Sequence, residues 1–395
     1  MDKSEISAMV LPVLAEENTS QNLTVTSSMN TSSTDARTNS SLFPLASYPL
    51  FRAAVWIYRI IVVVIFVLGV FGNTMTIILQ RRIGRGSNSG MSVFISSLAV
   101  SDSAVLVFLG TSLYLYSFEI DITNFHEVFC RTVYWSMYVL GMTSSWILVA
   151  MTLQRAASIL WPLRVNSAWT ARRAQTTVLV IVVISTLLNF HIMYGHSLQS
   201  LSSGKLLCFF VSEEYGEFFD TVWPSIDISL SSFLPFFLLI TSNIVLINRV
   251  KQSMREARQT LAAGSTDQIK IRQQKTSSMT LTLVCVSVAF LLLTSPLCVL
   301  SVIQNTGVHA SRNMVEASEI AANYFFEAIG NLLALANNAI NFYIYILTGS
   351  RYRAALASLF GPRETKKMTT NVTRSTVVTQ SSVFYIAHPL QEGDQ

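Results

Sequence analysis

The stretch that decides the fold runs from residue 280 to residue 303 and reads TLTLVCVSVAFLLLTSPLCVLSVI. It is predominantly apolar and contains no acidic or basic side chain. A helix needs about 20 such residues to cross the hydrocarbon core of a bilayer. Because lipid offers no hydrogen-bond partners, the backbone must satisfy its own polar groups, and a helix does so within one segment. The stretch is therefore predicted to be a transmembrane helix.

The chain contains seven apolar stretches of this kind. They lie near residues 55–80, 91–117, 128–160, 173–198, 221–249, 276–304 and 320–347. Only 12% of the residues are charged and 51% are apolar, whereas about 25% of the residues of a typical soluble domain are charged. The sequence thus predicts an all-α membrane protein, a bundle of seven transmembrane helices. The P-loop, HExxH and GxSxG signatures of enzymes are absent, and no enzymatic activity is expected.

Basic residues indicate how the chain crosses the membrane. Of the 27 Lys and Arg residues, 20 lie beside the first, third and fifth connections or after the last stretch. Since cytoplasmic segments carry the excess of positive charge, the N-terminus is predicted to be extracellular. Four Asn-x-Ser/Thr sequons in the N-terminal tail agree with that orientation, although a tail rich in Ser, Thr and Asn also produces sequons by composition alone. The expected glycosylation sites are Asn18, Asn22, Asn30 and Asn39.

The sequence divides into four parts. Residues 1–50 lack an apolar period and are predicted to be a disordered, glycosylated extracellular tail. The seven-helix domain is expected over 51–350. Residues 351–361 alternate basic and apolar side chains at helical spacing, which predicts a short amphipathic helix on the inner membrane surface. Residues 362–395 are expected to be a disordered cytoplasmic tail whose hydroxyl residues, once phosphorylated, would recruit arrestin.

Several of the apolar stretches contain individual residues or short motifs that are diagnostic by their order and spacing. They are Asn73 in GNTMTIIL, Asp102 in SSLAVSD, Arg155 in LQRAASILWPL, Pro296 in TSPLC, and Asn341 and Tyr345 in NNAINFYIY. In this order and spacing they resemble the rhodopsin-like (class A) G-protein-coupled receptors, over about 55–360. The segments around Arg155 and Tyr345 look like those of invertebrate neuropeptide receptors, including receptors for FMRFamide-like peptides. The resemblance implies a plasma-membrane receptor that transmits the binding of an amidated neuropeptide to a heterotrimeric G protein.

Four positions depart from the family's pattern. Gln154 stands in place of an acid, Ala156 in place of a tyrosine, Thr294 in place of a tryptophan and Phe342 in place of a proline. These departures keep open an alternative, a receptor-like binding protein with weak or no G-protein coupling. A transporter or channel is a further alternative, but the chain lacks the inverted repeats and paired intramembrane charges of that class.

The resemblance implies a disulfide bond between Cys130, at the start of the third stretch, and Cys208, in the connection between the fourth and fifth stretches. Both cysteines would face an oxidising compartment, where disulfides persist. The bond would hold that connection over the helix bundle.

Two histidines lie near the end of the fourth stretch. His191 and His196 are five residues apart, a spacing that does not place both side chains on one helix face. Structural roles are therefore predicted for them, in preference to metal binding or pH sensing.

Asp102 is a carboxylate within a transmembrane stretch, which makes it a candidate for function. It is similar to the family's sodium-binding aspartate, and the resemblance assigns a polar network around it and a structural Na⁺. The network is predicted to contain Asn73, Asp102, Ser144, Asn337 and Asn341. Apart from this Na⁺ no cofactor is expected. The alternative is a protonated aspartic acid that is hydrogen-bonded to its neighbours.

The predicted ligand site combines acids with tyrosines. It contains Tyr134, Met137, Tyr138, Asp227, Glu327 and Asn331. Met137 stands where amine receptors resembling this chain carry an aspartate, which argues against an amine ligand. Carboxylates and tyrosines suit a cationic, aromatic peptide end such as Arg-Phe-amide, through charge-assisted pairing and cation–π contact. The alternative is that both acids bond to neighbouring helices or lie at the water interface.

The resemblance also assigns residues to activation and to contact with the G protein. They are Arg155, Leu163, Phe290, Pro296 and Tyr345. Arg155 lacks the neighbouring acid of the family, so one restraint on the inactive state is missing. An ion pair near water contributes about 0–1 kcal/mol, and raised basal signalling is the expected consequence.

Overall fold

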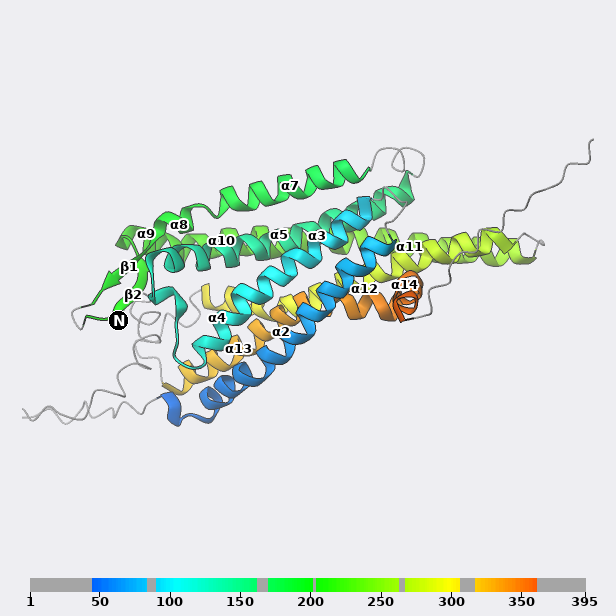
Figure 1. Cartoon of the computed structure of the whole chain (residues 1–395). Helices are drawn as coiled ribbons and strands as arrows, with labels where there is room; N and C mark the ends of the chain where they lie inside the picture. Colours follow the sequence, from blue (N-terminus) through cyan, green and yellow to red (C-terminus); the bar gives the residue numbers. More distant parts are fainter. Residues whose placement is uncertain are drawn as a thin grey trace, which may run out of the picture.

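The protein is a bundle of long helices, seen in a computed structural model that describes residues 45–83, 90–161, 170–201, 204–262, 267–305 and 317–360 (Figure 1). The helices are α2 (Pro49–Ile83), α3 (Gly90–Val105), α4 (Thr111–Tyr116), α5 (Glu127–Leu160), α7 (Ala171–Leu188), α8 (His191–Gly195), α9 (Glu213–Glu217), α10 (Trp223–Ile228), α11 (Leu234–Ala262), α12 (Asp267–Asn305), α13 (Ala317–Thr348) and α14 (Ser350–Phe360). Wide π-helical turns join α3 to α4 and connect α9, α10 and α11.

These helices form seven spans, which confirms the predicted fold class. Six spans are long and apolar enough to cross a membrane by themselves, and α13 with α14 supplies the seventh. Each overlaps one of the seven predicted stretches, but the fourth, predicted as 173–198, ends as a helix at Gly195, and His196–Ser200 form a strand. The exposed face of α7 carries Leu179, Val183 and Leu187, four residues apart, which is the side that a membrane helix presents to lipid.

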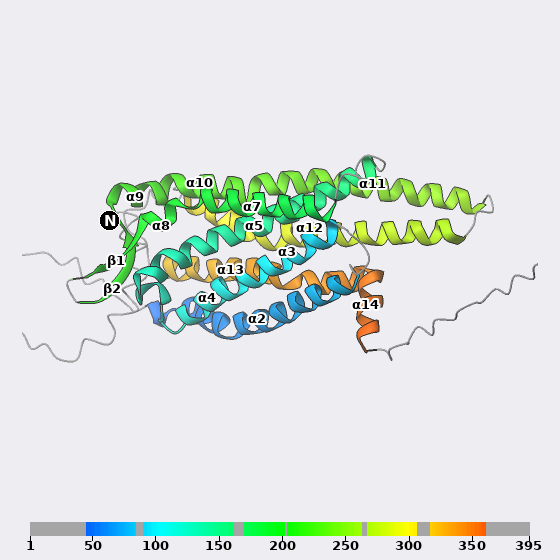
Figure 2. The same ribbon diagram turned by 45° about the horizontal axis from the view of Figure 1, so that its top comes forward.

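The boundaries of two predicted segments shift by a few residues. The predicted N-terminal tail ends at residue 50, but residues 45–47 already form a turn of 3-10 helix and α2 begins at Pro49. α14 covers Ser350–Phe360, against the predicted 351–361, and its axis turns 94° from that of α13. Figure 2 shows α14 lying across the end of the bundle.

The two ends of the bundle differ. One end carries an antiparallel hairpin of β1 (His196–Ser200) and β2 (Leu206–Phe210), with Leu198 opposite Cys208. The other end carries α14, and beyond it α11 and α12 continue out of the bundle (Figure 1). They are called here the hairpin end and the α14 end.

Helix starts follow ordinary capping chemistry. The Thr170 hydroxyl accepts a hydrogen bond from the amide of Arg173 at the start of α7, and the Ser212 hydroxyl does the same for Tyr215 at the start of α9. These side chains satisfy amides that the first turn of a helix leaves unpaired. Pro296 lies inside α12, where its ring removes one backbone hydrogen bond.

The core forms where α13 packs between α2 and α12. Gly69 on α2 allows this approach: a Cβ there would lie 2.8 Å from the Cβ of Ala339 and 2.5 Å from a methyl group of Leu106. Asn73 lies one turn further along and donates a hydrogen bond to the main-chain oxygen of Asn338 at 3.1 Å. The first and last spans are therefore joined both by close packing and by a buried polar bond.

Candidate functional site

A disulfide bond ties the hairpin to the bundle. Cys130 on α5 and Cys208 on β2 are joined, with their Cα atoms 5.4 Å apart, which is the pairing that the family resemblance implies. Beside it the amide of Cys208 donates a hydrogen bond to the side-chain oxygen of Asn124 at 2.7 Å. The start of the third span is therefore held against the hairpin on both sides of the covalent bond.

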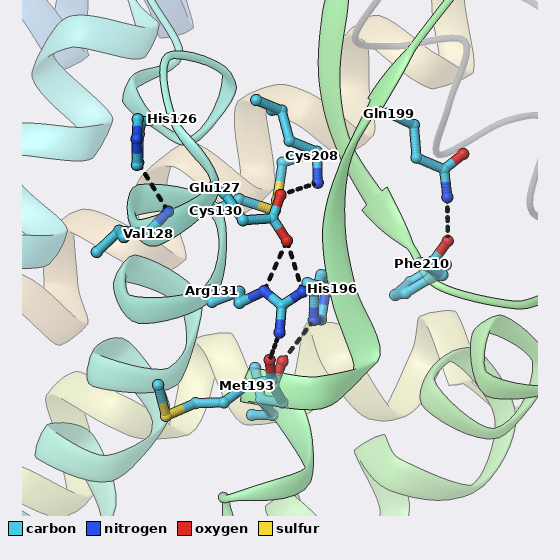
Figure 3. A network of polar contacts seen from close by, with 12 residues as sticks. His126, Glu127, Val128, Cys130, Arg131, Met193, His196, Gln199, Cys208 and Phe210 are labelled. Atoms are coloured by element: carbon cyan, nitrogen blue, oxygen red, sulfur yellow. Dashed lines mark hydrogen bonds and ion pairs between the residues drawn. A yellow bond between two sulfur atoms is a disulfide. The ribbon is translucent and has the colours of Figure 1, made fainter.

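An ion pair extends this attachment (Figure 3). The Glu127 carboxylate pairs with Arg131 one turn later, at 2.6 Å, and accepts a hydrogen bond from the amide of Leu198 on β1 at 2.7 Å. Arg131 in turn donates to the main-chain oxygen of Met193 at 3.2 Å. The sequence shows that Glu127 and Arg131 are opposite charges four residues apart. It does not show that this pair contacts the strand β1.

Aromatic side chains fill the space beneath the hairpin. His196 stacks on Tyr134 with ring centres 5.0 Å apart, and His191 meets the edge of Trp223 at 4.1 Å. Tyr215 bonds to Nδ1 of His191 at 2.8 Å and lies so close to the chain that a Cβ on Gly195 would be 1.8 Å from its ring.

His191 and His196 do not lie on one continuous helix, as their helical spacing assumes, because α8 ends at Gly195 and His196 begins β1. The chain turns there, so both rings join the same aromatic cluster even though they are five residues apart. Their predicted structural role stays a prediction.

The six predicted ligand residues lie on three helices. Tyr134, Met137 and Tyr138 follow one face of α5, Asp227 is on α10, and Glu327 and Asn331 are on α13. All are half-buried except Glu327, which is exposed. None of the six side chains is fully buried.

Electrostatic neighbours connect the two acids across this end. Glu327 interacts with Tyr116 at the end of α4, and Tyr116 with Tyr134. Tyr134 interacts with Tyr138, which faces Asp227. The predicted residues therefore adjoin one region, and sequence reasoning missed Tyr116, the link between Glu327 and the tyrosines of α5.

Asp102 is at the centre of a buried polar network in the middle of the bundle. Its carboxylate accepts a hydrogen bond from Ser144 on α5 and another from Asn341 on α13, the latter at 2.8 Å. Asn337 is buried one turn before Asn341. Asn73 instead bonds to the main chain of α13, and its own side-chain oxygen has no partner in the part of the chain that the structure describes.

Arg155 reaches α12 near the α14 end. Its Nε donates to the Thr280 hydroxyl at 3.4 Å. The preceding Gln154 is buried, and its side-chain oxygen has no hydrogen-bond partner among the described residues. Gln154, which replaces the acid of the family, therefore makes no hydrogen bond through its side-chain oxygen to the described residues.

Tyr345 takes part in a contact between α13 and α14 at the same end of the bundle. Its ring is buried and stacks on Tyr352 at 5.0 Å. The Tyr352 hydroxyl accepts a hydrogen bond from Gln80 on α2, and Gln80 accepts one from Ser92 on α3 at 3.0 Å. A pocket that Tyr345, Tyr352 and Gln80 help to line opens at this end.

Of the remaining predicted residues, Phe290 is buried and meets Phe236 edge to face, at 5.7 Å between ring centres. Pro296 is 6 residues further along the same helix. The other predictions fall outside the described residues. They concern Leu163, Asn18, Asn22, Asn30 and Asn39.

Known proteins share stretches of this sequence. The chain is 27% identical over 150 residues to the FMRFamide peptide receptor frpr-18 of Caenorhabditis elegans, covering 37% of this chain and 34% of that one. It is 23% identical over 331 residues to the FMRFamide receptor of Drosophila melanogaster, covering 79% and 55%. Galanin receptor 2a of Danio rerio is 27% identical over 129 residues, covering 33% and 35%. The matches thus span about a third to about half of the length of these relatives.

The pattern that defines the 7 transmembrane receptor (rhodopsin family) matches residues 72–345, which is more than half of the chain. That range begins within α2 and takes in the second to sixth spans and most of α13, together with Asp102, Arg155 and the disulfide. Members of this family are signalling receptors and not enzymes, and the apolar spans agree with a multi-pass plasma-membrane protein. The chain belongs to the rhodopsin family of seven-transmembrane receptors.

Proposed function

We propose that the chain binds an extracellular amidated neuropeptide at the hairpin end and transmits that binding to a heterotrimeric G protein at the α14 end. The observation that carries the ligand class is the pair of carboxylates, Asp227 and Glu327, which adjoin one region lined by tyrosines. Two of the relatives are named as FMRFamide receptors. A peptide that ends in Arg-Phe-amide has a guanidinium that can pair with a carboxylate and a ring that can pack against the tyrosines.

The proposed orientation is supported by the distribution of charge and by the disulfide. In this proposal the N-terminal tail, with its sequons, is extracellular and glycosylated, and the basic connections lie in the cytoplasm. The Cys130–Cys208 bond is at the hairpin end, which suits an oxidising exterior. α14 then lies on the inner leaflet, against membrane lipid.

Coupling is proposed to use the α14 end. Arg155 bonds to Thr280 and Tyr345 stacks on Tyr352, so both take part in contacts between spans that an outward movement of α12 or α14 would break. Ligand binding would shift the population between two packings of the bundle. Phosphorylated hydroxyl residues of 369–382 would then recruit arrestin.

Asp102 is proposed to hold a sodium ion. The donor set fits: the Asp102 carboxylate, with the Ser144 hydroxyl and the Asn341 amide bonded to it, offers the oxygen ligands that a hard cation prefers. Asp102, Ser144, Asn337 and Asn341 would hold the ion. A bound cation supplies a positive charge that keeps the Asp102 carboxylate ionised in the bundle centre.

A second candidate is a receptor-like binding protein that couples weakly or not at all. It is favoured by Gln154, which replaces an acid and leaves its buried oxygen unpaired among the described residues. The two candidates share the ligand site and differ only at the α14 end.

A screen of amidated neuropeptides on cells that express the chain and a promiscuous Gα tests the proposal, with calcium as the readout. Arg155→Ala is the matched variant, compared at equal surface expression. A response that the variant loses supports peptide reception with coupling. Binding of a labelled peptide without any calcium response supports the second candidate, and silence in both assays contradicts the peptide ligand.

A further inference from the structure

We propose that Glu327, together with Tyr58, Tyr116 and Tyr324, forms the subsite that receives the cationic group of the ligand, a guanidinium or an ammonium. Asp227, on the opposite side of the ligand region, does not. The proposal rests on the proposed peptide ligand and names the part of the site that binds its charge.

Three spans bring these residues together. Tyr324 and Glu327 are three residues apart on α13 and so lie on the same side of that helix. Tyr58 comes from α2 and Tyr116 from the last turn of α4. The Glu327 carboxylate interacts electrostatically with each of the three phenol groups.

Two of the tyrosines are held in place by other contacts. The ring of Tyr324 stacks on Phe51 at 4.8 Å and meets the edge of Tyr58 at 6.2 Å. The Tyr58 hydroxyl accepts a hydrogen bond from Asn331 at 3.2 Å. Rings fixed before the ligand arrives lose little conformational entropy on binding, which favours affinity.

Among the described residues, the Glu327 carboxylate accepts no hydrogen bond and forms no ion pair, and its side chain is exposed. It is therefore available to pair with a cation. A cation from the ligand would supply the missing partner, and the faces of the tyrosines would add cation–π attraction.

Asp227 has different surroundings. It is half-buried, and the phenol that interacts with it is that of Tyr138. Its other electrostatic neighbour is the thiol of Cys298. Among the described residues, the Asp227 side thus offers one tyrosine where the Glu327 side offers three, so Asp227→Asn is the comparison variant and should weaken binding of the cation less than Glu327→Gln.

The test measures binding to the purified full chain in lipid nanodiscs, without a G protein. The probe is the dipeptide Arg-Phe-amide, and the readout is the concentration that raises the melting temperature by half of its maximum. We expect Glu327→Gln to raise that concentration roughly tenfold or more, as for loss of a charge-assisted pair. Asp227→Asn should raise it by a smaller factor, and Glu217→Gln, which removes an exposed acid at the same end, should leave it unchanged.

Two altered probes identify the cation. Citrulline-Phe-amide lacks the guanidinium charge, and N-acetyl-Arg-Phe-amide lacks the ammonium charge. The probe that has lost the group bound by Glu327 should bind wild type weakly and be insensitive to Glu327→Gln. Glu327→Asp keeps the charge and controls for misfolding, because it should retain measurable binding of Arg-Phe-amide.

Equal binding of Arg-Phe-amide to wild type and Glu327→Gln overturns the proposal, as does a larger loss in Asp227→Asn. The absence of any shift with wild type at millimolar probe also overturns it. Because the assay detects binding alone, a failure of coupling in the peptide screen would leave a positive result here intact.

Discussion

Glu127 Oε2 accepts a hydrogen bond from the main-chain amide of Leu198 at 2.7 Å, across 71 residues of sequence. The other oxygen of the same carboxylate pairs with Arg131. One acid therefore fixes the direction of β1 relative to α5, directly beside the Cys130–Cys208 bond. The hairpin that covers the ligand region is positioned by a charge as well as by a disulfide.

Replacing that acid should weaken the hairpin attachment. Glu127→Ala is expected to lower the free energy of unfolding by about 1 kcal/mol, at the low end for charged hydrogen bonds because the pair is partly exposed. Thermal unfolding of the purified protein measures the effect. Glu217→Ala removes an exposed acid at the same end and should leave the melting temperature unchanged; an equal loss in both variants contradicts the assignment.

The stacked pair Tyr345 and Tyr352 should respond differently to loss of a hydroxyl. Tyr352→Phe leaves the buried amide of Gln80 without its acceptor, which costs about 1–3 kcal/mol. The Tyr345 hydroxyl has no hydrogen-bond partner among the described residues, so Tyr345→Phe should cost little. Both variants keep the stacking, and parallel melting curves that shift equally would contradict this account.

Restoring an acid next to Arg155 should lower basal signalling. Gln154→Glu supplies a carboxylate beside the guanidinium, and an ion pair worth up to about 1 kcal/mol would reduce the active population up to roughly fivefold. The measurement is G-protein activation without ligand, normalised to surface expression. Gln175→Glu, an exposed position on α7, is the control. A wild-type basal level equal to the agonist-stimulated level contradicts the small size proposed for this restraint.

Sodium should stabilise the protein through Asp102. Replacing choline chloride by sodium chloride at constant ionic strength is expected to raise the melting temperature of wild type and to have no effect on Asp102→Asn. Asp121→Asn removes the acid that caps Thr123, far from the network, and should keep the sodium effect. Equal sodium responses in wild type and Asp102→Asn argue against the site.

Acid should loosen the hairpin through His196. Burial among aromatic rings lowers the pKa of His196 below its ordinary value, so the folded protein holds the ring neutral. Below about pH 6.5 the unfolded chain binds a proton at His196 that the folded protein does not bind. The free energy of unfolding therefore decreases as the pH is lowered.

His196→Asn tests this pH dependence. The imidazole Nδ1 lies 3.1 Å from the Ile192 carbonyl oxygen and must be its donor, a role that an asparagine amide can take. Melting temperatures between pH 7.5 and 5.5 should therefore fall less in the variant than in wild type. Identical slopes would show that other groups cause the loss.

The sequence by itself determined the seven spans. Lipid requires long apolar segments with internal hydrogen bonds, and stretches such as 280–303 meet that demand wherever they pack. A different pattern, basic and apolar residues alternating at helical spacing, predicts a helix over 351–361, and α14 covers Ser350–Phe360. Asp102 could be singled out for a related reason, since an acid within an apolar stretch is conspicuous whatever surrounds it.

Only the tertiary structure decided which side chains meet at the two ends. His191 and His196 share a cluster because α8 stops at Gly195, and Tyr58 reaches Tyr324 because the first and last spans pack together. Glu127 holds Leu198 because the disulfide and the hairpin bring β1 over α5. These contacts join segments that are far apart in the sequence, so the local periodicity of apolar residues cannot predict them. They form only when the helices pack against one another.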